Sequence, residues 1–123
     1  MKLQLLALLL AAAPFAASAP DSPSLSGEWQ VHRSAGGTES DQTCKLIQKD
    51  SELTGTCSAE KAPVPLSGKV DGKKVTWTYK TEREGNLLTV IYEGVVESPS
   101  KITGTVTAVE FGVTGEFTAV RSR

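Results

Sequence analysis

The stretch TCKLIQKDSELTGTC, residues 43–57, contains both cysteines of the chain. The polar sequence KDSE in its middle separates two runs in which apolar and polar residues largely alternate, a pattern typical of a β-hairpin. If KDSE forms the loop, Gln48 pairs with Leu53, and Cys44 lies directly opposite Cys57. Opposite residues of an antiparallel pair are about 4.5–5.5 Å apart at Cα, within the range of a disulfide. We therefore predict a cross-strand disulfide between Cys44 and Cys57.

A free pair of thiols for redox or metal chemistry is the alternative interpretation of these cysteines. The chain has no CxxC spacing, and His32 is its single histidine, so the sequence lacks the partners that such a site needs. A disulfide-closed ring of this size contributes roughly 3 kcal/mol to stability in the chain-entropy model. We expect no metal site and no cofactor.

The first 19 residues have the layout of a secretory signal peptide. One positive charge at Lys2 precedes an apolar run at 3–13, and small residues follow. The apolar run is shorter than the roughly 20 residues of a membrane-spanning helix. We expect cleavage after Ser18 or Ala19 and a secreted product, periplasmic or extracellular, where a disulfide is stable.

The mature chain has the length of one domain. We expect a flexible, Pro- and Ser-rich segment at 20–26 and a single domain at 27–123. The formal net charge of the whole chain is −1, and no basic cluster is visible. Nucleic acids and anionic membranes are therefore poor candidates for partners.

No segment after residue 26 shows a helical period. Alternation of apolar and polar residues dominates, and turn residues interrupt it at intervals typical of an all-β sandwich or barrel. The predicted strands are 27–33, 42–48, 53–58, 64–70, 75–80, 87–97, 101–108 and 113–121. Their short connections imply antiparallel neighbours in up-and-down order. One apolar face on each strand favours an eight-stranded closed barrel, because closure removes exposed edges.

Glycines at inward positions in mid-strand also favour a small barrel. They are Gly55, Gly68, Gly94, Gly104 and Gly115. Glycine weakens a strand by roughly 0.5–1 kcal/mol, so its repeated use needs a reason, and crowding inside a narrow barrel supplies one. If DGKK and REGN are loops, Gly68 lies opposite Trp77, and Trp77 lies opposite Tyr92. The glycines either relieve crowding alone or leave space for a ligand.

Three motifs carry a resemblance to a known group: LSGEW at 25–29, the run from LTGTC to VTW at 53–77, and TGEFTAVR at 114–121. They are similar to the opening, an avidin-like hairpin and the last strand of calycin-type barrels, the group that contains lipocalins and avidins. The resemblance implies that Arg121 packs over Trp29. The mature chain also resembles a short barrel module of undefined role in secreted bacterial proteins. The polar residues with which avidins hold biotin are not recognisable, so biotin binding is not implied.

We expect a non-enzymatic barrel that binds a small apolar ligand or serves as an accessory module. Aromatic walls with few polar groups are typical of small-ligand pockets, although eight-stranded barrels can also be filled by their own side chains. The candidate lining residues are Trp29, Trp77, Tyr79, Tyr92 and Phe117, with Arg33 or Arg121 near a mouth. His32 is expected on the outer surface, and no serine has a histidine on its face, so we expect no enzyme.

The strand predicted at 87–97 is apolar on both faces. Leu87, Ile91 and Val95 point outward, and a continuous exposed apolar strip is typical of a contact surface. We predict a homodimer or protein-partner site there. The alternative is that the segment PDSPSL at 20–25 covers the strip.

A protease inhibitor is the alternative function. Periplasmic inhibitors of bacterial metalloproteases are eight-stranded barrels with one disulfide, and they resemble this chain at LSGEW. In those proteins a flexible N-terminal stretch enters the cleft of the enzyme, a role that APDSPS at 19–24 would take here. The tight disulfide hairpin and the repeated glycines depart from that family.

Overall fold

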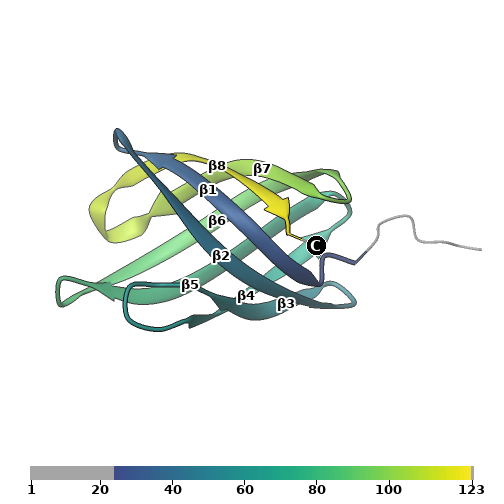
Figure 1. Cartoon of the computed structure of the whole chain (residues 1–123), viewed down its shortest axis with the longest axis horizontal. Coiled ribbons are helices and arrows are strands. Elements are labelled where there is room, and N and C mark those ends of the chain that lie inside the picture. The colour runs from purple at the N-terminus through teal and green to yellow at the C-terminus, as the bar shows by residue number, and fades with distance from the viewer. Residues whose placement is uncertain (1–23, 123) are drawn as a thin grey trace, which may run out of the picture.

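The chain forms a closed barrel of eight antiparallel strands (Figure 1). The structure is a computed structural model that describes residues 24–122, so the predictions for 1–19 and 20–23 lie outside the described residues. The strands are β1 (Gly27–Ala35), β2 (Thr38–Lys49), β3 (Glu52–Cys57), β4 (Val64–Asp71), β5 (Lys74–Arg83), β6 (Asn86–Ser98), β7 (Lys101–Ala108) and β8 (Val113–Arg121). Each pairs with its neighbours in sequence, and β1 also pairs with β8, which confirms the predicted up-and-down barrel.

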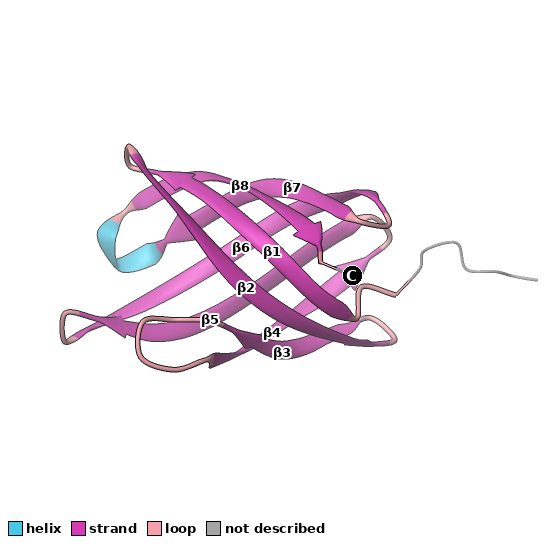
Figure 2. Ribbon diagram, viewed as in Figure 1, coloured by secondary structure: helices cyan, strands magenta, loops and turns pink. Residues whose placement is uncertain are grey.

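Strands and short connections account for almost all of the described chain (Figure 2). The exception is η1 (Val109–Phe111), a single 3-10 turn between β7 and β8. No helix within residues 24–122 is long and apolar enough to cross a membrane.

The predicted hairpin register is confirmed. Cys44 pairs with Cys57 and forms the disulfide, and Gln48 pairs with Leu53. Both cysteines are fully buried, so the bridge lies inside the barrel. The disulfide therefore links β2 and β3 from within the core.

The connection between β1 and β2 is shorter than the predicted one at 34–41. Both strands continue to a tight turn at Gly36 and Gly37, whose φ angles are +60° and +80°. A two-residue hairpin turn with two positive φ angles matches the twist of the flanking strands, and glycine adopts it without strain. The glycine pair thus makes a sharp hairpin where the sequence pattern suggested a longer loop.

Aromatic side chains fill the middle of the barrel. The rings of Trp77 and Tyr92 stack at 4.9 Å between centroids, and Phe117 meets both edge-on, at 5.6 Å and 5.0 Å. Such pairs contribute roughly 0.5–1.5 kcal/mol each beyond the burial of their surface. The Nε1 group of Trp77 is buried without a hydrogen-bond partner among the described residues. At this level the interior is packed, as the filled-barrel alternative expects.

Glycine makes this packing possible where β4 meets β5. Gly68 pairs with Trp77, as predicted, and Trp77 pairs with Tyr92. A Cβ atom on Gly68 would collide with the carbonyl oxygen of Thr76 and would lie 2.7 Å from the Cα of Trp77. The glycine therefore permits a close approach of two backbones, which supports the relief of crowding.

One end of the barrel is covered by the residues that precede β1. Leu25 is buried, its N–H donates to Gln48 Oε1 at 2.9 Å, and its carbonyl accepts the indole N–H of Trp29 at 2.9 Å. Arg121 lies over the Trp29 ring at 4.6 Å and donates to the Ser26 carbonyl at 2.7 Å. The contact between Arg121 and Trp29 is the one that the calycin resemblance implies.

The buried position of Leu25 differs from the flexible segment predicted at 20–26. The apolar side chain leaves water at the end of the barrel, and three hydrogen bonds fix the backbone around it. Residues 24–26 are thus part of the folded domain.

We expect the disulfide to stabilise the barrel by roughly 3 kcal/mol, because it restricts the unfolded chain over a ring of this size. Urea unfolding of the oxidised protein should be compared with that of the same protein after reduction, which keeps every side chain in place. Equal free energies of unfolding in the two states would contradict the expectation.

We expect Gly68→Ala to lower the free energy of unfolding by about 1–3 kcal/mol, since the new methyl group forces β4 and β5 apart. Ser67→Ala, on the exposed face of the same strand, is the matched control and should stay close to wild type. Thermal and urea unfolding of the two variants measure the difference. A Gly68→Ala protein as stable as Ser67→Ala would show that the close approach is not limiting.

Candidate functional site

A pocket of about 350 Å³ occupies the end of the barrel opposite Leu25. Its walls are aliphatic side chains on the inner face of β6, β7 and β8, namely Leu88, Val90, Val106, Ala108 and Val113. Its rim consists of the β1–β2 turn, the β5–β6 turn and η1, which lie together at one end of the barrel (Figure 1). The volume is within the range of small-molecule sites, at its lower end.

Two arginines line the pocket, Arg33 inside the barrel and the exposed Arg83 at the rim. Arg33 lies on β1, is half-buried, and lines the pocket together with Ser40. Its Nε donates to Ser40 Oγ at 3.1 Å, and its Nη1 lies 3.3 Å from the hydroxyls of both Tyr79 and Tyr92. Its Nη2 group makes no hydrogen bond within residues 24–122, so the donors of this one nitrogen stay free.

A polar network holds Arg33 from the core side of the pocket. Gln42 donates from Nε2 to the Tyr79 hydroxyl at 2.8 Å and to the Ser58 carbonyl at 2.6 Å, and its Oε1 accepts from the Tyr92 hydroxyl at 2.7 Å. Gln42 is buried, at 5% exposure. Because the amide of Gln42 is neutral, it fixes the ring hydroxyls without adding a charge.

Sequence reasoning did not include Gln42 among the site residues. The alternation of inward and outward residues along the strand could have identified it. Gln42 precedes the inward Cys44 by two residues and therefore shares its face of β2. A polar side chain at an inward position in a narrow barrel indicates a hydrogen-bond network, since a buried amide needs partners.

The network holds Arg33 charged and Tyr92 neutral. Burial is the main cause that raises the pKa of Tyr92, so its hydroxyl stays protonated. Burial by itself lowers the pKa of Arg33, but its electrostatic interactions and hydrogen bonds with Tyr92 and Tyr79 outweigh that effect, and the pKa of Arg33 is raised. The pocket therefore contains a permanent positive charge.

The turn η1 forms an apolar part of the rim. Glu110 anchors it by accepting hydrogen bonds from the Thr89 N–H at 2.6 Å and the Thr89 hydroxyl at 2.8 Å. These bonds, the backbone one first, lower the pKa of Glu110. Phe111 lines the pocket and remains 51% exposed. A large apolar side chain at an entrance is suited to contact with an apolar ligand.

The predicted lining residues lie at three levels of the barrel: at the pocket, in the middle and at the covered end. Arg33 lines the pocket, and Tyr79 and Tyr92 contact Arg33 from the core side. Trp77 and Phe117 pack against Tyr92 in the middle of the barrel and do not line the pocket. Trp29 and Arg121 lie at the covered end. Residues 24–26 close that end over Trp29, so these last two residues do not line this pocket.

The outward apolar residues of β6 are separated rather than continuous. Leu87 and Val95 are about half exposed, whereas Ile91 between them is only partly exposed. Leu87 borders an open surface groove together with Lys61 and Lys80. Leu25 does not cover these residues, since its side chain is buried inside the barrel and they point outward. The contact surface at Leu87, Ile91 and Val95 stays a prediction.

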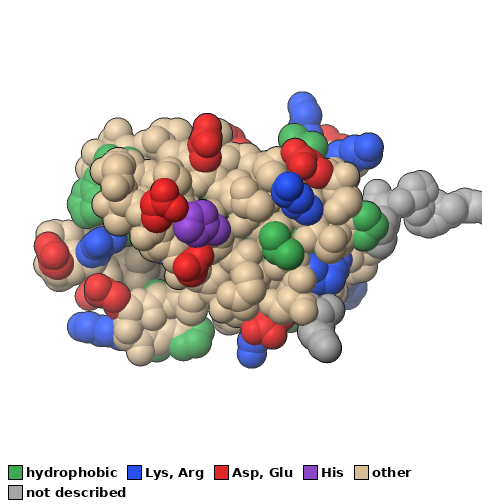
Figure 3. Space-filling model, turned by 45° about the horizontal axis from the view of Figure 1, so that its top comes forward, with side chains coloured by type: hydrophobic (Ala, Val, Ile, Leu, Met, Phe, Trp, Pro, Cys, Tyr) green, Lys and Arg blue, Asp and Glu red, His purple; other side chains and the backbone are tan. Residues whose placement is uncertain are grey.

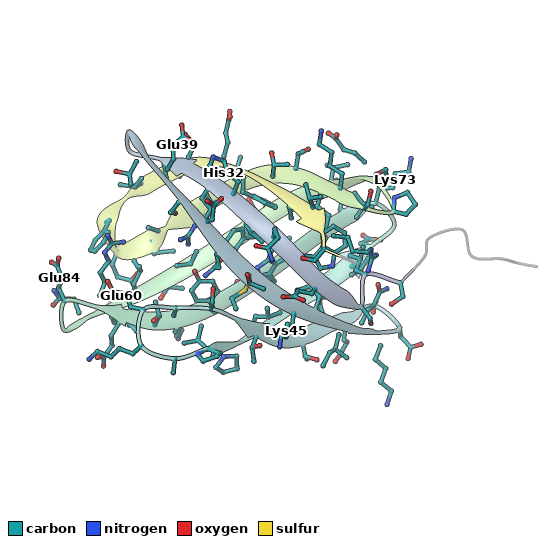
Figure 4. The ribbon with its side chains drawn as sticks, viewed as in Figure 1. His32, Glu39, Lys45, Glu60, Lys73 and Glu84 are labelled. Atoms are coloured by element: carbon teal, nitrogen blue, oxygen red, sulfur yellow. A yellow bond between two sulfur atoms is a disulfide. The ribbon has the colours of Figure 1, made fainter. Side chains whose placement is uncertain are left out.

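His32 lies on the outer face of β1 between two carboxylates (Figure 3). Its Nδ1 is 2.8 Å from Asp41 and its Nε2 is 2.7 Å from Glu39, both on β2 (Figure 4). Hydrogen bonds to Asp41, and then to Glu39, raise the pKa of His32 above its ordinary value. The sequence missed these partners because both residues fall in the segment that was predicted as a loop.

The fold and the pocket define a closed antiparallel β-barrel with a cavity of small-molecule size at one end. No family model matches the chain, and no curated protein matches it. Two solved structures are similar in fold, those of the redesigned β-barrels mFAP0 and mFAP1, each bound to DFHBI.

Each of these structures is 20% identical to this chain, with TM-scores of 0.56 and 0.55. The matches cover 79% of this chain, and 98% and 94% of those two chains. At that identity the similarity shows the shared fold of an eight-stranded barrel. It assigns no family, so the calycin-type resemblance stays a prediction.

We expect the stability of the barrel to fall as the pH rises through the titration of His32. The pKa of this group is higher in the folded state than its ordinary value of 6.5, so its contribution is complete below about pH 6.5. It is lost as the pH passes the raised native pKa. Urea unfolding across this range should show the decline in wild type and its absence in His32→Gln, and parallel curves for the two proteins would contradict it.

Proposed function

We propose that the protein is a secreted, non-enzymatic β-barrel that binds a small, largely apolar ligand in the pocket above Arg33. The observation that carries this proposal is the contrast between the two ends of the barrel. One end is filled by Leu25 and Trp29, while the other has a pocket of about 350 Å³ with aliphatic walls. An apolar concavity with a few fixed polar groups is the usual form of a small-molecule site.

The structural neighbours support this proposal at the level of the fold. Each of the two redesigned barrels is bound to DFHBI. A barrel of this architecture is thus able to hold a small molecule. The ligand of the present chain follows from its own lining residues and not from those structures.

Secretion is supported by the signal-like residues 1–19 and by the Cys44–Cys57 disulfide, which is favoured in oxidising compartments. A binding role rather than a catalytic one is supported by the chemistry of the lining. Ser40 and Thr38 line the pocket, but His32 faces away from it on the outer surface. The histidine of the chain is therefore not placed to activate a hydroxyl of the described lining.

The alternative role as a protease inhibitor depends on the N-terminal segment. Residues 24–26 are held at the covered end, where Leu25 is buried and Arg121 binds the Ser24 and Ser26 carbonyls. Only the residues before Ser24 are left to enter the cleft of an enzyme. A deletion that tests inhibition should therefore stop at residue 23 and leave Leu25 in place.

Calorimetric titration with two neutral probes, 2-naphthamide and octanamide, tests ligand binding. We expect at least one of them to bind the mature protein, and Ala108→Phe to weaken that binding about ten-fold or more, because the added ring occupies the pocket.

Thr107→Phe is the matched control, since the same ring is added to the neighbouring residue on the outer face of β7. It should bind the probes like wild type. Failure of both probes to bind, or equal weakening by the two substitutions, would refute the pocket as the binding site.

A further inference from the structure

We infer that the natural ligand carries an acidic group, a carboxylate, that pairs with Arg33 at the base of the pocket. This inference rests on the proposed function and adds the chemical class of the ligand. The geometry combines a fixed guanidinium, which has no carboxylate partner in the described part of the chain, with aliphatic walls above it.

No carboxylate among the described residues compensates the charge of Arg33. Within residues 24–122 the carboxylate-to-cation contacts shorter than 4.0 Å involve His32 alone, so neither Arg33 nor Arg83 has an acidic partner. Glu84 is the one acidic residue in the described lining, and it lies in the β5–β6 turn at the tip of the rim (Figure 4). A half-buried arginine without a counter-charge provides a favourable position for an anion.

The orientation of the guanidinium also suits a carboxylate. Ser40, Tyr79 and Tyr92 hold Nε and Nη1, while Nη2 keeps its donors free. The tyrosine hydroxyls are themselves fixed by Gln42, so the group is held before a ligand arrives. Preorganisation of this kind favours binding, because little side-chain freedom remains to be lost.

A purely structural role for Arg33 explains the geometry less well. The hydroxyls of Tyr79 and Tyr92 already have Gln42 as a partner, so the network has hydrogen bonds without the arginine. A neutral side chain at position 33 would avoid the desolvation of a charge. The cost of a cation at this place is offset when an anion binds beside it.

The walls define the rest of the ligand. Leu88, Val90 and Val106 are all less than 10% exposed and face the pocket above Arg33. These side chains favour an aliphatic or aromatic body, and Phe111 adds an aromatic contact at the rim. The ligand class is therefore a small organic acid with one charged end and one apolar end.

A matched pair of probes, 2-naphthoate and 2-naphthamide, tests the inference by calorimetry on the mature protein. The two have the same shape and differ in charge. We expect wild type to bind the acid about ten- to hundred-fold more tightly, the range for a hydrogen bond to a charged group. Arg33→Met should remove this preference and leave the affinity for 2-naphthamide nearly unchanged, which also shows that the variant is folded.

Two further variants separate the local effect from net charge. Lys73→Gln removes one positive charge at the covered end of the barrel, far from Glu84 (Figure 4), and should keep the full preference. Arg33→Lys keeps the charge without the planar fork and should keep part of it.

Equal binding of the two probes by wild type would overturn the inference while the proposed function stands. A preference for the acid that survives in Arg33→Met would also overturn it. If neither probe binds, the proposed function fails, and the inference fails with it.

Discussion

The aromatic layer of Trp77, Tyr92 and Phe117 is the packing on which the rest of the barrel depends. It can form only because Gly68 lets the backbones of β4 and β5 approach closely beside the indole ring. The layer fills the middle of the barrel and so separates its two ends. Each end is then free to serve a different purpose, one as a structural cover and the other as a pocket.

The site shares residues with this core and does not lie on the outer surface. The ring of Tyr92 belongs to the aromatic layer, while its hydroxyl binds Gln42 and accepts from Arg33. A displacement of the layer therefore changes the position of the charged group. This connection explains how a residue with a long, flexible side chain is held in one orientation at the base of the pocket.

Much of the fold was predictable because it depends on local, repeated patterns. Alternation located the eight strands, and the spacing of Cys44 and Cys57 set the register of the second hairpin. The burial of Leu25 was not predictable, because it depends on the closure of the barrel and not on its own neighbours in sequence.

The site was predictable only in part. Residue type and parity selected Arg33, Tyr79 and Tyr92, but they do not tell which end of the barrel stays open. That depends on Leu25 covering Trp29 at one end, while two glycines at 36–37 draw β1 and β2 into a tight turn at the other. Such long-range arrangements leave no periodic signal along the chain.

The cover formed by Leu25 and Trp29, together with the aromatic layer, makes the interior a blind-ended cavity and not an open channel. If a molecule binds there as proposed, it has to leave through the opening by which it came, and the water that it displaces has to pass it on the way out. Long chains cannot be threaded through the protein, so the depth between rim and aromatic layer sets the greatest length that fits. Exchange of a ligand with solution then depends on a single entrance, whose width is set by the side chains around it.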